Sequence, residues 1–215
     1  GLINAHDHIT YTNANPGNRG EERFNHRHEW RTAKNGHKEI KAPRTNVPET
    51  GELRMLLSGT TSIFGSGEHK GLARNLDKED AVEGHGYAAY NTFPLGDNNG
   101  NMYDSGCDKY KYALKSGNHV PHIGEGISES ALNELRCLSG DGKGAKDIFD
   151  SKLAIIHGVA ATPAIISAMA EKNVKLVWSP RTNISLYGDT ARIPLYYDMG
   201  VTIALGTDWI YSGSM

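Results

Sequence analysis

The stretch "LAIIHGVAATPAIISAMAEKNVKLVWSP", residues 153–180, decides the fold. It opens with a short apolar run at 153–158, which predicts a strand. Thr162 suits an N-cap and Pro163 suits the first helical position, so a helix is expected to begin there. A second apolar run follows at 174–180. Apolar strands that alternate with helices are typical of a parallel sheet covered by helices.

The same alternation extends in both directions along the chain. We predict further strands and helices, and an eighth strand near 71–76 that the sequence shows only weakly. The expected strands are 2–9, 60–67, 86–96, 119–126 and 201–208, and the expected helices are 52–59 and 192–200. All 215 residues are therefore expected to form one parallel α/β domain.

Composition excludes several classes of partner. The formal net charge is −2, from 23 basic and 25 acidic residues, so nothing favours nucleic acid or an anionic membrane surface. Residues 153–170 carry no charge, but His157, Gly158 and Pro163 divide them, and we expect no membrane span. We expect a small-molecule substrate, and homo-oligomer formation is left open.

Cys107 and Cys137 are 30 residues apart and form no CxxC pair. Two such cysteines do not indicate a disulfide framework or a zinc knuckle. We therefore expect a reducing, cytoplasmic setting.

Residues 10–51 interrupt the pattern of strands and helices. They are polar, rich in Asn, Arg, His and Gly, and largely lack a hydrophobic period. A segment of this length in a compact domain is usually functional or disordered. We expect it to form a long loop after the first strand, with a role as a lid.

Six polar side chains fall at the carboxyl ends of predicted strands. These residues are His6, His8, His122, Glu125, His157 and Asp208. In a parallel barrel the carboxyl ends of all strands open onto one face, which holds the active site. We therefore expect residues from four strands to converge there.

The spacing of His6 and His8 has a physical reason. Residues i and i+2 of a strand point the same way, so two imidazoles can grip one ion while Asp7 points to the opposite face. With His122 and Asp208 they would supply four groups to a divalent metal, preferably zinc, with iron or manganese as alternatives. Bound metal lowers the pKa of water from about 15.7 to about 7. Glu125, three residues after His122, could then carry a proton.

Each of these residues also has an ordinary interpretation. A lone HxH is more often incidental, His157 could be a buried hydrogen-bonded histidine, and Asp208 could cap a helix. Their shared position at strand ends favours the metal site. A second HxH, His26 and His28, lies in the polar segment with no strand leading into it, so nothing is expected to hold both rings on one face.

The motifs "NAHDH", "HIGEG", "IIHG" and "LGTDW", in this order, resemble the amidohydrolase superfamily of metal-dependent hydrolases. "LVWSPRTNISLYG" is similar to the strand-7 segment of its chlorohydrolase and cytosine-deaminase-like branch. The resemblance runs from residue 2 to about 209. It implies a distorted (β/α)8 TIM-like barrel with one divalent metal.

By position, the resemblance also assigns roles. His6, His8 and His122 would bind metal, and Asp208 would be both ligand and base. Glu125 would be the acid/base, and His157 would hold the attacking water or polarise the substrate. The pocket would be lined by Arg181 and Asn183.

Two departures from the family pattern matter. No lysine follows the strand near "FPLGD", so a carboxylated-lysine, two-metal site is not expected. The small β-sandwich that family members commonly carry is absent from these 215 residues, which fits a barrel core without its flanking domain.

The resemblance implies hydrolysis of a C–N bond in a small nitrogen-containing substrate, by deamination or by opening of a cyclic amide. One alternative is a metal-dependent phosphoesterase, but that class tends to end in an Asp-x-His pair, whereas Trp209 and Ile210 follow Asp208 here. Another is a catalytically silent metal-binding barrel. The fold alone cannot choose among them.

Overall fold

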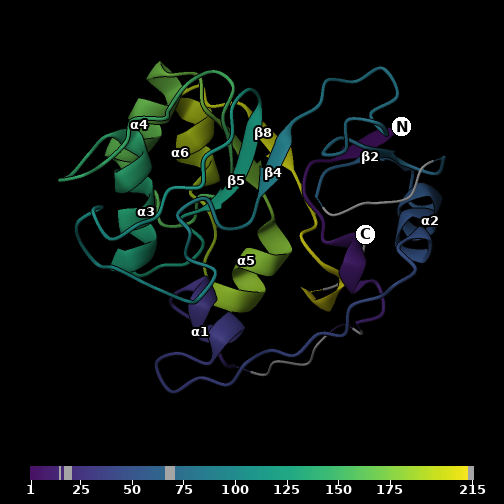
Figure 1. Ribbon diagram of the computed structural model, residues 1–215, viewed down its shortest axis with the longest axis horizontal. Helices are drawn as coiled ribbons and strands as arrows, with labels where there is room; N and C mark the ends of the chain where they lie inside the picture. Colours follow the sequence, from purple (N-terminus) through teal and green to yellow (C-terminus); the bar gives the residue numbers. More distant parts are fainter. Residues whose placement is uncertain (15, 17–20, 66–70, 213–215) are drawn as a thin grey trace.

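A computed structural model describes residues 1–14, 16, 21–65 and 71–212. Within this part of the chain, parallel strands form a three-stranded sheet of order β1-β2-β3 and a five-stranded sheet of order β4-β5-β6-β7-β8 (Figure 1). The strands are β1 (Leu2–Asn4), β2 (Thr60–Ile63), β3 (Arg74–Asn75), β4 (Ala89–Asn91), β5 (His119–Ile123), β6 (Ala154–His157), β7 (Lys175–Trp178) and β8 (Ile203–Leu205). The weakly indicated eighth strand is present as β3.

The helices follow the strands along the chain. They are η1 (Ile9–Tyr11), α1 (Arg27–Thr32), α2 (Glu49–Leu57), α3 (Glu129–Ser139), α4 (Pro163–Glu171), α5 (Pro180–Tyr187), α6 (Ile193–Asp198) and η2 (Ile210–Ser212). Figure 1 shows α3, α4 and α6 together on one side of the five-stranded sheet, and α2 beside the smaller sheet.

The stretch at 153–180 folds as predicted. Its two apolar runs are β6 and β7, which pair in parallel, and α4 lies between them. The Thr162 side chain accepts a hydrogen bond from the backbone N–H of Ile165, and Pro163 starts the helix. No helix in the described ranges has both the length and the apolar character needed to cross a membrane.

Alternate residues of the strands pack on opposite faces, as period-2 geometry requires. Ile155 and Leu176 belong to the large core between the five-stranded sheet and its helices. Ile156 and Val177 belong instead to an inner cluster. That cluster also holds Phe64, which directly follows β2, so the two sheets share one interior.

Hydrogen bonds outside the strands link the two sheets at both borders. Ala5 donates to the Leu205 carbonyl at 2.9 Å, and Asp7 and Asp208 form a parallel bridge. At the other border, the Ala88 amide donates to the Leu76 carbonyl at 3.1 Å. The parallel α/β prediction is confirmed; the strands lie in two sheets rather than in one continuous barrel sheet.

The prediction that residues 10–51 are mainly irregular is wrong at two places. Residues 27–32 form α1, which the Nδ1 of His26 caps by accepting from the His28 amide, and α2 already begins at Glu49. Six residues are too few to show a hydrophobic period, and the cap is a histidine rather than Ser, Thr, Asp or Asn. Residues 15 and 17–20 of this segment lie outside the described residues.

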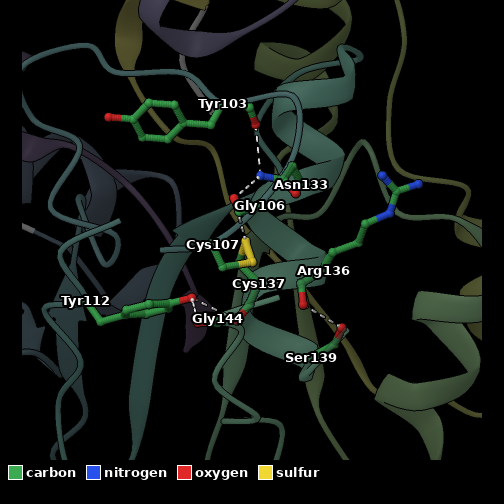
Figure 2. The surroundings of a disulfide bond; sticks show 9 residues. All are labelled: Tyr103, Gly106, Cys107, Tyr112, Asn133, Arg136, Cys137, Ser139 and Gly144. Atoms are coloured by element: carbon green, nitrogen blue, oxygen red, sulfur yellow. Dashed lines mark hydrogen bonds between the residues drawn. A yellow bond between two sulfur atoms is a disulfide. The ribbon is translucent and has the colours of Figure 1, made fainter. Parts of the chain in front are cut away.

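The two cysteines are not free thiols. Cys107 and Cys137 form a buried disulfide, with their Cα atoms 5.4 Å apart, which joins the loop after β4 to α3 (Figure 2). On the same helix, the Asn133 amide donates to the carbonyls of Tyr103 and Gly106, which hold the loop beside the bridge. The pairing leaves no signal in the spacing, because only the packing of the loop on α3 brings the two residues together. Disulfides are rare in reducing compartments, so this bridge weighs against the cytoplasmic setting, which stays a prediction.

Candidate metal centre

The side chains of His6, His8, His122 and Asp208 meet at the carboxyl ends of the strands. Each offers a ligand atom, and these atoms all lie within 4.8 Å of one another. The Nε2 atom of His6 is 3.0 Å from Asp208 Oδ1, and that of His8 is 3.4 Å from the same oxygen. Asp7 lies apart, where its carboxylate accepts from the Thr207 hydroxyl. The four residues thus converge, as expected from the topology.

The local electrostatics keep these groups ready to bind a cation. Burial lowers the pKa of His8 to about 3 and, together with the neighbouring histidines, holds the pKa of His122 well below its usual range. Burial alone would raise the pKa of Asp208, but the hydrogen bond from His6 and the charges of the nearby histidines hold it below its ordinary value. At neutral pH the imidazoles of His8 and His122 are therefore neutral and the carboxylate is ionised, which is the state that metal ligation needs.

A further observation tests whether a metal fits. His122 is 2% exposed, yet neither of its ring nitrogens has a hydrogen-bond partner among the described residues, and His6 Nδ1 also lacks one there. Buried polar groups without partners are rare in proteins, since each costs about 1–3 kcal/mol. Three imidazoles and one carboxylate match the donor set of a catalytic zinc site. The residues present therefore fit a divalent metal.

The backbone is strained at two strand ends of this centre. His157 and Asp208 have positive φ values of 75° and 67°, in the left-handed region that residues other than glycine rarely adopt. Because Ile156 points to the inner cluster, regular alternation of side chains along β6 would turn the next residue, His157, towards the helices. Instead its ring lies 5.2 Å from that of His122. Such strain tends to cluster at functional sites.

Glu125 is held in a tight turn between two glycines. Gly124 has φ 65° and Gly126 has φ 144°, and an added Cβ would lie 2.6 Å from Leu135 and 2.3 Å from the Asn25 carbonyl, respectively. The Gly124 amide donates to Glu134 of α3 at 2.9 Å. The motif "HIGEG" is therefore needed both for its ligand and for the close packing that holds Glu125.

The other predicted site residues differ in their surroundings. His157 Nε2 is 3.5 Å from Glu125 Oε2, and its Nδ1 donates to Asn183 Oδ1 at 3.0 Å. Asn183 is fully buried, so its amide orients His157 rather than facing a cavity. Arg181 is exposed in the first turn of α5.

Sequence reasoning missed two tyrosines of the site. The Tyr90 ring, from β4, packs against His6 and His122, and its hydroxyl lies 3.4 Å from His8 Nδ1. Tyr187, the last residue of α5, donates from its hydroxyl to Glu125 Oε1 at 2.7 Å. Neither follows a polar motif, although "SLYG" lies within the segment that the resemblance covers.

An aromatic cavity opens beside the centre. It has a volume of about 250 Å³ and its lining includes the rings of Tyr11, Trp30 and Trp209, with residues 39–42 as a further wall. Trp209 directly follows Asp208, and the Tyr11 ring is 6.0 Å from that of His8. The segment 10–51 thus supplies most of the cavity wall.

The second HxH is also buried, contrary to the expectation that nothing holds its rings together. His26, His28 and Glu134 bring ligand atoms within 4.8 Å of one another. However, His26 Nδ1 accepts from the His28 amide, and His28 Nδ1 accepts from Arg31 Nε at 3.2 Å. Each Nε2 therefore carries the proton and donates, to Glu134 at 3.2 Å and to Asp97 at 2.7 Å, respectively. A metal ligand needs a free lone pair on a ring nitrogen, and hydrogen bonds occupy all four nitrogens of His26 and His28. This cluster is therefore a hydrogen-bond network.

Solved structures of known proteins share the fold described above. No family model matches the sequence. The chain is similar to a triazine hydrolase variant, with a TM-score of 0.59 and 17% identity, over 99% of this chain and 60% of that one. It is also similar to atrazine chlorohydrolase TrzN from Arthrobacter aurescens TC1 complexed with zinc, with a TM-score of 0.53 and 16% identity, over 99% and 60% of the two chains.

A curated protein matches a shorter segment. Over 62 residues the chain is 40% identical to a 5-methylthioadenosine/S-adenosylhomocysteine deaminase from Haloquadratum walsbyi, which covers 29% of this chain and 14% of that protein. These similar proteins are described as two hydrolases and a deaminase, which agrees with the predicted resemblance to the amidohydrolase superfamily. The chain spans 60% of the length of the solved structures quoted above.

Proposed function

We propose that the chain is the distorted (β/α)8 core of a metal-dependent amidohydrolase that cleaves a C–N bond in a small, nitrogen-containing ring compound. The observation that carries the proposal is the cluster of His6, His8, His122 and Asp208, in which both ring nitrogens of His122 lack partners within the described part of the chain. The shared interior of the two sheets and the hydrogen bonds at their borders support the barrel.

The four clustered residues would hold one divalent metal, with zinc preferred. When bound, the metal would supply a water of lowered pKa and would polarise the substrate. Asp208 is ionised and lies within 3.4 Å of two imidazoles, so its carboxylate can accept the proton of the attacking water. The Glu125 carboxylate would take up the second proton of that water and pass it to the leaving nitrogen. His157, held at Nδ1 by Asn183, would stabilise the charge that develops on the substrate.

The aromatic cavity favours a planar substrate. Three rings line it, from Tyr11, Trp30 and Trp209, and planar rings gain about 0.5–1.5 kcal/mol each from stacked or edge-to-face contacts. Residues 39–42 would close over the bound ring as a lid. The predicted pocket residue Arg181 stays a proposal, whereas we propose a positioning role for Asn183.

The test is a screen of the zinc-loaded protein against cyclic amides and amino-substituted nitrogen heterocycles. Released ammonia would indicate deamination, and a mass gain of one water without ammonia would indicate ring opening. Glu125→Gln should bind zinc equally and lose at least about a hundredfold in kcat. A wild-type protein that binds one zinc and forms neither product contradicts the proposal, and cleavage of a phosphate ester in a parallel assay would favour the phosphoesterase.

A further inference from the structure

Glu125 has two oxygens with different partners. Oε1 accepts from the Tyr187 hydroxyl at 2.7 Å, whereas Oε2 faces His157 Nε2 at 3.5 Å. The backbone of Glu125 is held separately, because its carbonyl accepts from the Arg27 amide at 3.1 Å. The hydrogen bond from Tyr187 therefore restrains the rotation of the Glu125 side chain, which the backbone contact leaves free.

The Tyr187 hydroxyl is itself oriented by a second donor. Trp30 Nε1 donates to its oxygen at 3.1 Å, so the hydroxyl proton is directed to Glu125. Tyr187 is 2% exposed, and burial with the nearby Glu125 charge holds its pKa well above the usual value. The hydroxyl therefore stays protonated and remains a donor over the working range of pH.

Trp30 also belongs to the aromatic cavity. Its ring centroid is 5.3 Å from that of Trp209, which follows Asp208, and it lines the cavity next to Tyr11. One edge of the indole thus contacts the proposed substrate space while its N–H reaches the tyrosine behind Glu125.

We propose that Tyr187 is a positioning residue for Glu125, that it keeps Oε2 directed at the reacting groups, and that Trp30 sets the direction of its hydroxyl from the cavity wall. The inference rests on the proposed function of Glu125. Tyr187 does not touch the substrate. Its removal should slow proton transfer and leave substrate binding unchanged.

The experiment compares Tyr187→Phe with the wild type on the substrate that the screen identifies. We expect kcat to fall about tenfold to a hundredfold, with KM changed less than twofold and the zinc content unchanged. Trp30→Phe, which keeps a ring but loses the donor, should lower kcat less. Tyr112→Phe is the matched control, since that hydroxyl donates to the Cys137 carbonyl at 3.3 Å, away from the centre, and kcat should stay at the wild-type value.

A double-mutant cycle separates positioning from a general structural effect. In a Glu125→Gln background, Tyr187→Phe should cause little further loss in kcat, because no proton carrier remains to be positioned. Wild-type kcat in Tyr187→Phe overturns the inference, and so does an equal loss of kcat in both backgrounds.

A spectroscopic readout does not depend on turnover. The chain has three tryptophans, so their indole N–H signals can be assigned by substitution in ¹H–¹⁵N spectra. The Trp30 signal should move in Tyr187→Phe and stay in place in Tyr112→Phe, and an unmoved signal in Tyr187→Phe overturns the inference.

A wild-type protein inactive on the whole panel overturns the proposed function and the positioning role together. An active wild type together with an unchanged kcat in Tyr187→Phe overturns the positioning role alone.

Discussion

At the scale of single residues, two histidine pairs of the same HxH spacing have different chemistry. His6 and His8 lie beside His122, whose ring nitrogens have no partner in the ranges that the structure describes, whereas both nitrogens of His26 and of His28 are hydrogen-bonded. Unpaired lone pairs in a buried cluster of imidazoles around the Asp208 carboxylate favour a cation. Paired ones hold a segment in place. The difference lies in the partners that the fold supplies.

His122→Asn tests this contrast. Removing one imidazole ligand should lower zinc content from about one equivalent to below about 0.1, because the metal loses one bond and the coordination geometry is left incomplete. Metal analysis after dialysis measures it. His28→Asn should retain the zinc of the wild type, and a loss of zinc in His28→Asn instead of His122→Asn would reverse the assignment of the two clusters.

His119 predicts a pH dependence of stability. It lies at the opposite end of β5 from the centre, and burial with the nearby Lys115 lowers its pKa to about 4, against about 6.5 in the unfolded chain. Between pH 4 and pH 6.5 the unfolded chain binds a proton at His119 that the folded protein does not. The contribution of neutral His119 to folding stability is therefore full above pH 6.5 and is lost as the pH falls towards 4.

Urea unfolding of the metal-free protein at pH 7.5 and pH 5 measures this effect. Between pH 7.5 and pH 5, the free energy of unfolding of the wild type should fall by about 1 kcal/mol more than that of His119→Gln. Equal losses in the two proteins would mean that His119 is protonated in the folded state as readily as in the unfolded chain.

At the scale of elements, α1 is anchored by buried charge rather than by apolar surface. Arg27 is 1% exposed, its guanidinium pairs with Asp97 of the loop after β4, and it donates to the Thr92 carbonyl at 2.6 Å. Glu134 of α3 lies 3.9 Å from the same guanidinium nitrogen that pairs with Asp97. The short helix thereby presents Trp30 to the cavity and contacts the turn that carries Glu125.

Asp97→Asn should be strongly destabilising. Breaking one partner of a buried ion pair costs about 3–5 kcal/mol, because the remaining charge is left uncompensated. The exposed pair of Asp147 and Lys172, at 3.0 Å, offers the control, and Asp147→Asn should cost less than about 1 kcal/mol. Similar unfolding free energies for the two variants would contradict the anchoring role.

The disulfide acts on the same elements, since it joins α3 to the loop that carries Asp97. Replacing both Cys107 and Cys137 by Ser should lower the unfolding free energy by about 2–4 kcal/mol, through a loop closed over 30 residues. Wild type treated with dithiothreitol should match the variant in thermal unfolding. A treated wild type that unfolds at its original temperature would show that the bridge contributes nothing to stability.

At the scale of the whole molecule, the proposed metal would join the two sheets. His6 and His8 follow β1 of the smaller sheet, His122 lies on β5 of the larger one, and Asp208 follows β8. Ligands from both sheets meeting at one ion would join the sheets across the border between β1 and β8, where backbone hydrogen bonds such as that from Ala5 to Leu205 also link them.

Because its proposed ligands come from both sheets, bound metal should raise the free energy of unfolding of the whole domain. At free zinc one hundredfold above Kd, the expected gain is about 2.7 kcal/mol, visible as a rise in Tm that a chelator reverses. His122→Asn should show no rise. A Tm of the wild type that is insensitive to both zinc and chelator would mean that the four residues do not act as a metal site.

The sequence alone determined the parallel α/β class and predicted which strand ends carry the candidate site residues. The apolar runs at 153–158 and 174–180, with a capped helix between them, are local signals, and local signals survive in a single sequence. The side chains at the strand ends followed from topology, because the carboxyl ends of parallel strands share one edge.

Only the tertiary structure decided the rest. The disulfide, the α1 anchor, the buried second HxH and the Tyr187 contact each join residues far apart in the chain, such as Tyr187 and Glu125 at a separation of 62. No period or motif records such pairings, because they depend on which surfaces pack together. Whether an imidazole binds a metal or a carboxylate is therefore decided by its neighbours in space.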